Sequence, residues 1–279
     1  MTTAHSPGFQ NAWSALAPAF RRCLELAHMS SAARGLAVGS VLTDARGQIV
    51  AEGRDRVYDA PGGADALQGT PLAHAEMNVL AAVPTELDIG DHVLWSTQRP
   101  CPMCTVALSC TGVGRVRFMA EDPAFDGVGA PPGGPVTRPA ALTSVDGPGG
   151  LARTDESGGR VRAGGPDGRA RPGEPCVPVP DDGSHGPVWE GPSPSPWVVT
   201  ANLLFLHNIA RARGTAASVI ARNRWTEPET VELTLDVVTE GVMIDAFAAG
   251  RPLTATLAEL WDRIVEAAVS RDARRGASA

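Results

Sequence analysis

The sequence has few aromatic residues and few cysteines. Aromatic side chains make up 5% of the 279 residues, whereas 31 glycines and 24 prolines indicate that part of the chain is loop-like. Five dispersed cysteines are too few for a disulfide framework, and two of them form a Cys-x-x-Cys sequence. The first residues also lack the basic and apolar regions of a signal peptide. We therefore expect a cytoplasmic protein.

The chain also lacks an excess of positive charge and a long hydrophobic run. Its net charge is −7, and a protein that grips a phosphate backbone normally presents a basic face. The most apolar stretch, residues 197–210, is interrupted by polar residues and is too short to cross a bilayer. These absences favour a small-molecule substrate, with no nucleic-acid partner and no membrane partner.

The first part of the chain alternates between helix patterns and strand patterns. Helical spacing of apolar residues or a helix-start signal marks 11–30, 73–83 and 102–110, and short apolar runs typical of strands mark 36–42, 48–57, 92–96 and 115–119. Turn residues 44–47 separate the first two strands and predict a hairpin. This alternation predicts an α/β sandwich with a central sheet, and we assign residues 11–126 to one domain.

The second part changes character twice. Residues 127–196 are rich in Gly and Pro without apolar periodicity, which predicts a largely disordered insertion or linker that includes Cys176 as a free thiol. Helical spacing returns in residues 197–270, which we assign to a C-terminal helical region. Within it, Thr226 and Glu229 have the spacing of a capping box at the start of a helix.

Two short motifs carry the chemistry. His74-Ala75-Glu76 and Pro100-Cys101-Pro102-Met103-Cys104 each lie at the start of a predicted helix. Residues three apart share a helix face, so Cys101 and Cys104 can bind one metal ion together with His74. Two thiolates and an imidazole suit tetrahedral zinc, and the fourth position stays open for water, as a catalytic zinc requires. Glu76 can then act as general base and afterwards as general acid.

A Cys-x-x-Cys sequence also occurs in structural zinc knuckles and in redox pairs. A structural zinc usually has four protein ligands, and no fourth Cys or His follows at a suitable spacing. A redox pair has no need of an upstream His-x-Glu. The motifs therefore favour a catalytic zinc held by His74, Cys101 and Cys104.

The paired motifs, H-x-E followed by P-C-x-x-C, resemble the cytidine/deoxycytidylate deaminase superfamily. The resemblance covers about residues 16–126. PCPMC at 100–104 resembles tRNA adenosine deaminases and guanine deaminases, and HAEMNVL at 74–80 resembles deoxycytidylate deaminases equally well. The resemblance implies a three-layer α/β/α fold with a mixed five-stranded sheet, and a homodimer.

The sequence departs from these relatives at positions that could choose the substrate. Gln98-Arg99 stands where they usually have Leu-Glu or a similar pair, and Asp55 stands where many carry a substrate-contacting Asn. A carboxylate at Asp55 could accept from an N–H but could not donate as an amide does. Arg99 could bind an anionic group. The candidate substrate contacts are Asp55, Ala75 and Arg99. Two alternatives stay open: Asp55 could instead cap a turn, and Arg99 could instead be solvated or pack against a helix.

Together these features predict a zinc-dependent hydrolytic deaminase that releases ammonia from a small nucleobase, nucleoside or related amino-heterocycle. A tRNA adenosine deaminase and a non-catalytic zinc-binding scaffold of the same fold are the alternatives. The motifs do not choose between a purine and a pyrimidine ring.

Overall fold

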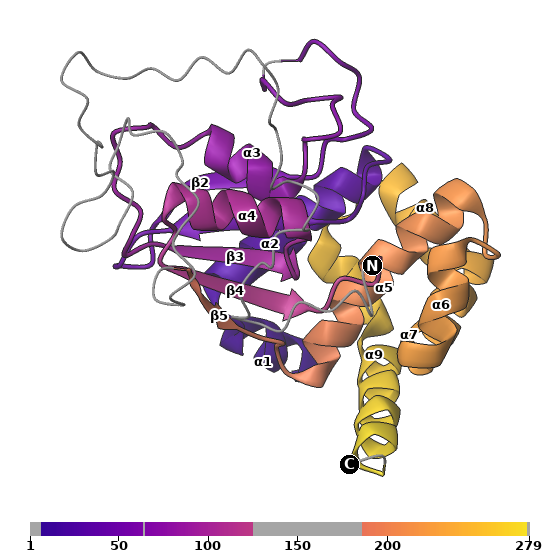
Figure 1. Cartoon of the computed structure of the whole chain (residues 1–279). Helices are drawn as coiled ribbons and strands as arrows, with labels where there is room; N and C mark the ends of the chain where they lie inside the picture. Colours follow the sequence, from indigo (N-terminus) through magenta and orange to yellow (C-terminus); the bar gives the residue numbers. More distant parts are fainter. Residues whose placement is uncertain (1–6, 64, 125–185, 278–279) are drawn as a thin grey trace, which may run out of the picture.

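The computed structural model of the chain describes residues 7–63, 65–124 and 186–277 (Figure 1). Strands β1 (Gly39–Thr43) and β2 (Ile49–Arg54) form an antiparallel hairpin, and β1 also pairs antiparallel with β3 (Val93–Gln98). Strands β4 (Arg115–Ala120) and β5 (Val188–Glu190) extend the sheet in parallel, which gives the order β2-β1-β3-β4-β5. The predicted mixed five-stranded sheet is confirmed.

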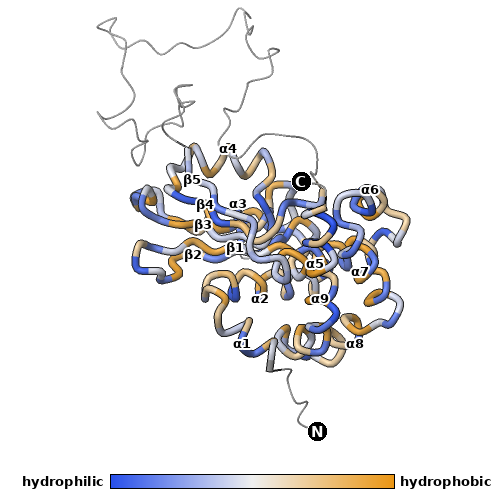
Figure 2. Tube along the Cα trace, turned by 90° about the horizontal axis from the view of Figure 1, so that it is seen from below, coloured by the Kyte–Doolittle hydropathy of each residue, from blue (hydrophilic) through white to orange (hydrophobic). Residues whose placement is uncertain are grey.

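Helices cover both faces of this sheet, as Figure 2 shows. One layer contains α1 (Pro7–Ala15) and α2 (Pro18–Ala32), and the other contains α3 (Ala75–Ala81) and α4 (Pro102–Thr111). The sequence predicted one helix over 11–30, but the structure has two. Proline disfavours a helical conformation in the residue before it, and Ala17, which precedes Pro18, is extended with ψ 136°.

Successive side chains along a strand pack alternately against the two helix layers. Val41 packs toward α2, whereas Leu42 and Leu94 pack with Val79 of α3 and Leu108 of α4. All five residues of β1 are buried, because the strand has a neighbour on each edge and a helix layer on each face. These two apolar clusters fix the position of α3 and α4 on the sheet.

Strand β5 lies in the segment that the sequence assigned to the linker, residues 127–196. Val188, Trp189 and Glu190 instead pair with residues 115–117 of β4. A three-residue strand is too short to show a period-two pattern, and its hydrogen bonds and the packing of Trp189 exist only once β4 is beside it. Of the rest of the segment, residues 127–185, including Cys176, lie outside the described residues. The domain boundaries themselves stay predictions.

Five helices follow the sheet. They are α5 (Ser195–Arg213), α6 (Ser218–Thr226), α7 (Pro228–Glu240), α8 (Val242–Ala248) and α9 (Leu253–Gly276). Residues 197–210 of α5 are all buried, because α5 lies against α2 and β4 on one side and against α7 and α9 on the other. The largest apolar cluster accordingly joins Leu24 of α2 to Leu204 of α5 and Leu257 of α9. None of the described helices combines the length and apolarity needed to span a bilayer.

Candidate metal centre

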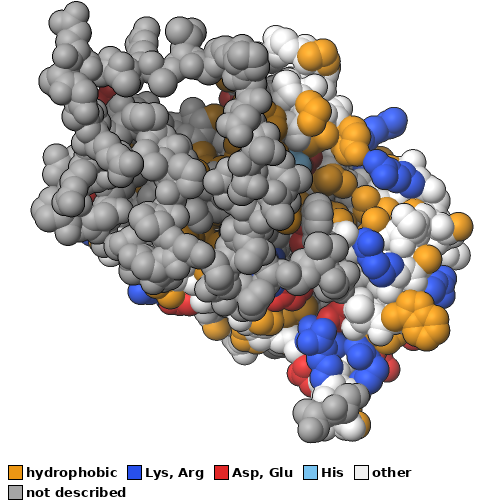
Figure 3. Space-filling view, in the orientation of Figure 1, with side chains coloured by type: hydrophobic (Ala, Val, Ile, Leu, Met, Phe, Trp, Pro, Cys, Tyr) orange, Lys and Arg blue, Asp and Glu red, His pale blue; other side chains and the backbone are white. Residues whose placement is uncertain are grey.

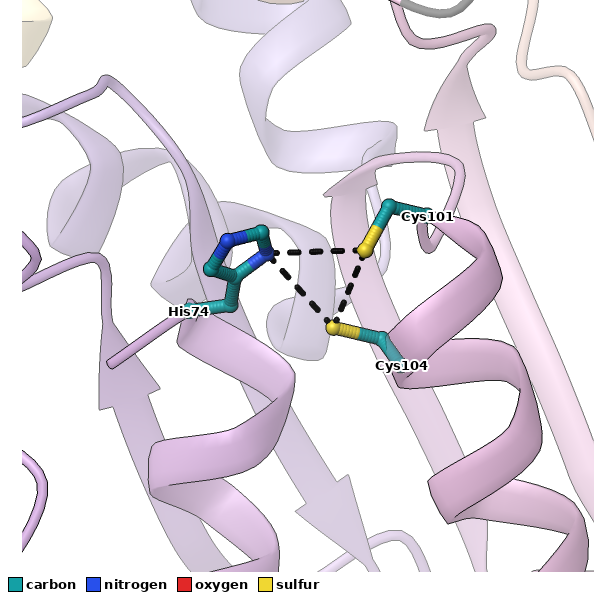
Figure 4. Close-up of side chains that lie close together, drawn as sticks. All are labelled: His74, Cys101 and Cys104. Carbon is teal, nitrogen blue, oxygen red and sulfur yellow. Dashed lines mark hydrogen bonds between the residues drawn. The ribbon is translucent and has the colours of Figure 1, made fainter. Parts of the chain in front are cut away.

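The two sequence motifs meet because α3 and α4 begin side by side at one end of the sheet (Figure 4). His74 is the N-cap residue of α3, and Cys101 is the N-cap residue of α4; both have extended backbones, with ψ values of 156° and 167°. Cys104 lies in the first turn of α4. Proline at the first helical position of α4 suits this start, since it has no N–H to leave unsatisfied.

The three predicted ligands form one compact cluster. His74 Nδ1 lies 3.6 Å from Cys101 Sγ and 3.7 Å from Cys104 Sγ, and the two sulfurs are 3.6 Å apart. Zinc bonds of about 2.3 Å to sulfur and about 2.0 Å to nitrogen would separate tetrahedral ligand atoms by about 3.5–3.8 Å. The observed spacing therefore fits a zinc ion bound by these three side chains. No other group of three such side chains close enough to hold a metal occurs among the described residues.

The ligands influence one another's protonation. Hydrogen bonding to Cys101 raises the pKa of His74 to about 9, against the opposing effect of burial. Hydrogen bonding from Cys104, with a further contribution from His74, lowers the pKa of Cys101 to about 4. The pKa of Cys104 is raised, first by its hydrogen bond to Cys101 and then by burial. One sulfur is thus already a thiolate, which is the form that binds zinc.

Glu76 lies beneath this cluster on α3 and is 3% exposed. The hydroxyl of Ser96, on β3, donates a hydrogen bond of 2.7 Å to Glu76 Oε1. Burial raises the pKa of Glu76, and the Ser96 hydrogen bond opposes this rise. Sequence reasoning missed Ser96; the available signal was a hydroxyl within an otherwise buried strand.

The start of α3 is tied directly to strand β2. The side-chain amide of Asn78 donates to the backbone oxygens of Arg54 (2.8 Å) and Ala73 (3.0 Å). Gly53 of β2 permits the close approach, since a Cβ there would lie 2.5 Å from the backbone oxygen of Ala75. These contacts hold the segment that carries His74 and Glu76 against the sheet.

A cavity opens beside the cluster. In addition to His74, Glu76 and Cys101, it is lined by Leu36, Val38, Asp55, Ala75, Gln98, Arg99, Asp122, Ala124 and Phe205. All three candidate substrate contacts therefore lie around the cavity. Sequence reasoning missed Asp122 after β4, and it missed Phe205, which reaches the cavity from α5.

Three of the polar side chains that line this cavity are carboxylic acids, namely Asp55, Glu76 and Asp122. Asp55 is 2% exposed and accepts a hydrogen bond from the backbone N–H of Val57, so it caps a turn and also lines the cavity. Burial raises the pKa of Asp55 to about 6 and that of Asp122 to about 7. Arg99 donates to Glu121 at 3.1 Å, so its charge is already paired.

Comparison with known proteins finds a family that this arrangement resembles. Residues 15–120 match the family described as the cytidine and deoxycytidylate deaminase zinc-binding region. These residues, called the deaminase region, are therefore similar to that family. No curated protein matches the chain.

Several solved structures resemble the deaminase region. Guanine deaminase from Bacillus subtilis is 28% identical, with 37% of this chain and 62% of that chain covered and a TM-score of 0.31. The dCMP deaminase of cyanophage S-TIM5 is 22% identical, with 43% and 90% covered and a TM-score of 0.30. A structure from a study of A-to-I editing by tRNA A34 deaminases is 23% identical, with 38% and 77% covered and a TM-score of 0.31. The chain thus spans about three fifths of the guanine deaminase.

The predicted zinc cofactor is confirmed. The matched family is a zinc-binding one, and the three donors of the deaminase region lie together at distances that suit the ion. The catalytic role of Glu76 and the substrate contacts of Asp55, Ala75 and Arg99 stay predictions.

Proposed function

We propose that the chain is a zinc-dependent hydrolytic deaminase that releases ammonia from a small nucleobase, nucleoside or related amino-heterocycle. One observation carries the proposal. The cluster of His74, Cys101 and Cys104 stands beside a buried carboxylate, Glu76, whose position the Ser96 hydroxyl fixes. A purely structural zinc site has no use for a buried, oriented carboxylate next to its ligands.

The residues divide the work as follows. Zinc bound by His74, Cys101 and Cys104 supplies the Lewis acidity that makes water a nucleophile at neutral pH. Glu76 accepts one proton from the attacking water on its carboxylate and delivers it to the ring nitrogen. It then takes the remaining hydroxyl proton of the tetrahedral adduct and delivers it to the leaving amine, which departs as ammonia. Burial helps this exchange, because it raises the pKa of Glu76 and so makes the protonated form accessible. Ser96 holds Oε1 and leaves the second oxygen to carry the proton.

The charges around the cavity favour a small substrate over a nucleic acid. Asp55, Glu76 and Asp122 are carboxyl groups on the cavity wall, and Glu121 pairs with Arg99. A phosphate backbone entering here would meet acidic groups. On the face seen in Figure 3, basic side chains are dispersed over the C-terminal helices among apolar ones and form no continuous track.

The decisive experiment is ammonia release by the zinc-loaded chain over cytosine, adenine and guanine compounds as base, nucleoside and nucleotide. We expect turnover with at least one of them and a loss of about 10²-fold or more in Glu76→Gln, with zinc content unchanged. Glu86→Gln, the same change at an exposed loop position, should keep full activity.

Other outcomes would contradict the proposal. Full activity in Glu76→Gln would remove the role of Glu76. One zinc per chain without turnover of any compound would favour the non-catalytic scaffold. A gel shift with tRNA, together with deamination of tRNA alone, would favour the tRNA adenosine deaminase.

The proposal extends to the protein's partners and surroundings. We expect a homodimer and a cytoplasmic location, both on the strength of the resemblance to cytidine and deoxycytidylate deaminases. Light scattering coupled to size exclusion tests the first of these, and a mass of one chain would contradict it.

A further inference from the structure

Gln98 is a buried amide for which the described part of the chain offers no hydrogen-bond partner. Its side chain is 2% exposed, and neither Oε1 nor Nε2 has a partner among the described residues. A buried polar group left unpaired is costly, so buried amides in native proteins nearly always have a partner. Gln98 also lines the cavity that contains His74, Glu76 and Cys101. The missing partner is therefore to be sought in that cavity.

The strand places this amide at a definite position relative to the reacting groups. Gln98 is the last residue of β3, and side chains two residues apart on a strand point to the same face. Ser96, which holds Glu76, therefore shares its face. Two residues of strand span about 6.5 Å, which is comparable to the width of a planar heterocycle. One ring can thus reach both Glu76 and Gln98.

The rest of the cavity suits such a ring. Phe205, Leu36 and Val38 supply apolar surface on the wall, and Asp55 and Asp122 supply acceptors. Phe205 comes from α5 and is 3% exposed, so packing of the C-terminal helices holds it in place. Among the described residues that line the cavity, only Gln98 has both an unpaired hydrogen-bond donor and an unpaired hydrogen-bond acceptor.

We propose that Gln98 is a specificity-determining residue that binds a substrate ring edge carrying an adjacent acceptor and donor, as a ring lactam (O=C–N–H) does. The amide Nε2–H donates to the lactam oxygen, and Oε1 accepts from the lactam N–H. The amino group to be removed faces Glu76, so the lactam is formed by other atoms of the same ring. This inference rests on the proposed deaminase function and names the substrate class of that site.

Two pairs of compounds test this inference, and within each pair the leaving amino group is the same while the lactam is present or absent. Guanine is paired with 2-aminopurine, and cytosine with 4-aminopyrimidine. We expect Gln98→Leu to lower kcat/KM about 10- to 100-fold for the lactam member of the active pair, because the lactam then loses both hydrogen bonds. The partner without a lactam should change less than threefold.

Two control variants distinguish a loss of lactam recognition from a general loss of folding. Gln98→Glu keeps the size and the acceptor but loses the donor, and it should show the same selective loss. Gln10→Leu makes the same change at an exposed site on α1, across the sheet from the cavity, and should leave both members unchanged. Equal losses for both members in both Gln98 variants would overturn the inference.

A binding measurement separates this inference from the proposed function. Zinc-loaded Glu76→Gln protein, with and without Gln98→Leu, is titrated with xanthine and uracil, which carry lactams. We expect at least tenfold weaker binding when Gln98 is replaced. If no compound is deaminated but this loss is seen, the deaminase proposal fails and the role of Gln98 stands.

Two other outcomes would contradict the role of Gln98. If the chain deaminates its substrate and Gln98→Leu keeps the lactam preference within threefold, the function stands and the role of Gln98 fails; a water molecule then satisfies the amide. If there is neither turnover nor lactam binding, both fail.

Discussion

A single hydrogen bond from Ser96 opposes the effect of burial on Glu76, the proposed proton carrier. Burial raises the pKa of Glu76, and the Ser96 hydroxyl holds that rise in check. A hydrogen bond to the charged form of a carboxyl lowers its pKa, so the hydroxyl keeps Glu76 able to give up its proton as well as to accept one. At this scale the site depends on a residue outside both sequence motifs.

Replacing Ser96 by alanine should shift the pH dependence of deamination. The Glu76 pKa should rise further, so the acidic limb of the kcat/KM profile should move to higher pH, and activity at neutral pH should fall about tenfold. Zinc content should not change. Ser40→Ala is a matched control, because Ser40 pairs with Ser96 across β1 and β3 and its hydroxyl has no partner among the described residues. An unshifted profile in Ser96→Ala would contradict the role of this hydrogen bond.

In the C-terminal helices, contacts with other helices decide which residues cap a helix end. The sequence predicted a capping box with Thr226 and Glu229, but the N-cap residue of α7 is Glu227 and makes no side-chain cap. Thr226 is the last residue of α6, and Glu229 pairs with Arg274 of α9 at 2.6 Å. Pro228 is the first residue of α7, where a missing backbone N–H costs nothing. Glu229, which the local pattern assigned to capping, therefore forms an ion pair with Arg274 of α9 instead.

The strongest of these contacts joins α7 to α9. Arg271 Nε lies 2.7 Å from Glu227 Oε2, Arg271 Nη2 lies 2.9 Å from Oε1, and both side chains are 7% exposed. Arg271 also donates to Ser195 at the start of α5, at 3.1 Å. This bidentate pair therefore fixes three helices relative to one another.

Removing one partner of the pair should destabilise the protein. We expect Arg271→Met to lower the free energy of unfolding by about 1–3 kcal/mol, because Glu227 would lose its bidentate partner and keep only the contact with the exposed Arg275 at 2.5 Å. The double variant Glu227→Leu/Arg271→Met should lose clearly less. Urea unfolding measures both. A double variant as unstable as the single one would show that packing, and not the unpaired charge, causes the loss.

At the scale of the whole molecule, α5 joins the deaminase region to the C-terminal helices. It contributes Phe205 to the cavity and Leu204 to the cluster shared with α2 and α9. The two regions that the sequence assigned separately therefore share one core. We infer that the stability of the site depends on the packing of α5.

A buried histidine on α5 makes this core sensitive to pH. His207 is fully buried, and neither ring nitrogen has a hydrogen-bond partner among the described residues. Burial, with a smaller contribution from Arg211, lowers its pKa to about 4 from 6.5. Above pH 6.5 the ring is neutral in both the folded and the unfolded chain. As the pH falls from 6.5 toward 4, only the unfolded chain takes up this proton, so the contribution of His207 to stability decreases.

The expected loss from His207 between pH 7 and pH 5 is about 2 kcal/mol of unfolding free energy. His207→Leu should remove this contribution, so the difference in stability between the variant and the native chain should change by that amount over the same interval. Urea unfolding at the two pH values measures it. His92→Gln, at a histidine with a hydrogen-bond partner in Asp91 at 2.7 Å, serves as the comparison. The same pH dependence in His207→Leu as in the native chain would contradict the assignment.

Local pattern was sufficient for the ligands and for most of the elements. His74, Cys101 and Cys104 could be predicted because their spacing and their places at helix starts are set within a few residues of chain. The hairpin of β1 and β2 could be predicted from apolar runs around a turn. Each motif and the hairpin turn depend on neighbouring residues alone, whereas the meeting of the two motifs depends on how α3 and α4 pack on the sheet.

The tertiary structure alone decided which other side chains share the site. Ser96 reaches Glu76, and Gln98 and Phe205 reach the cavity, only through the pairing of β3 and the packing of α5. Strand β5 is a strand only because β4 lies beside it. Contacts between segments far apart in the chain depend on register and on how faces fit together, and a local pattern encodes neither. The sequence by itself determined the metal and the expected reaction, whereas the folded chain determined which groups are positioned to meet the substrate.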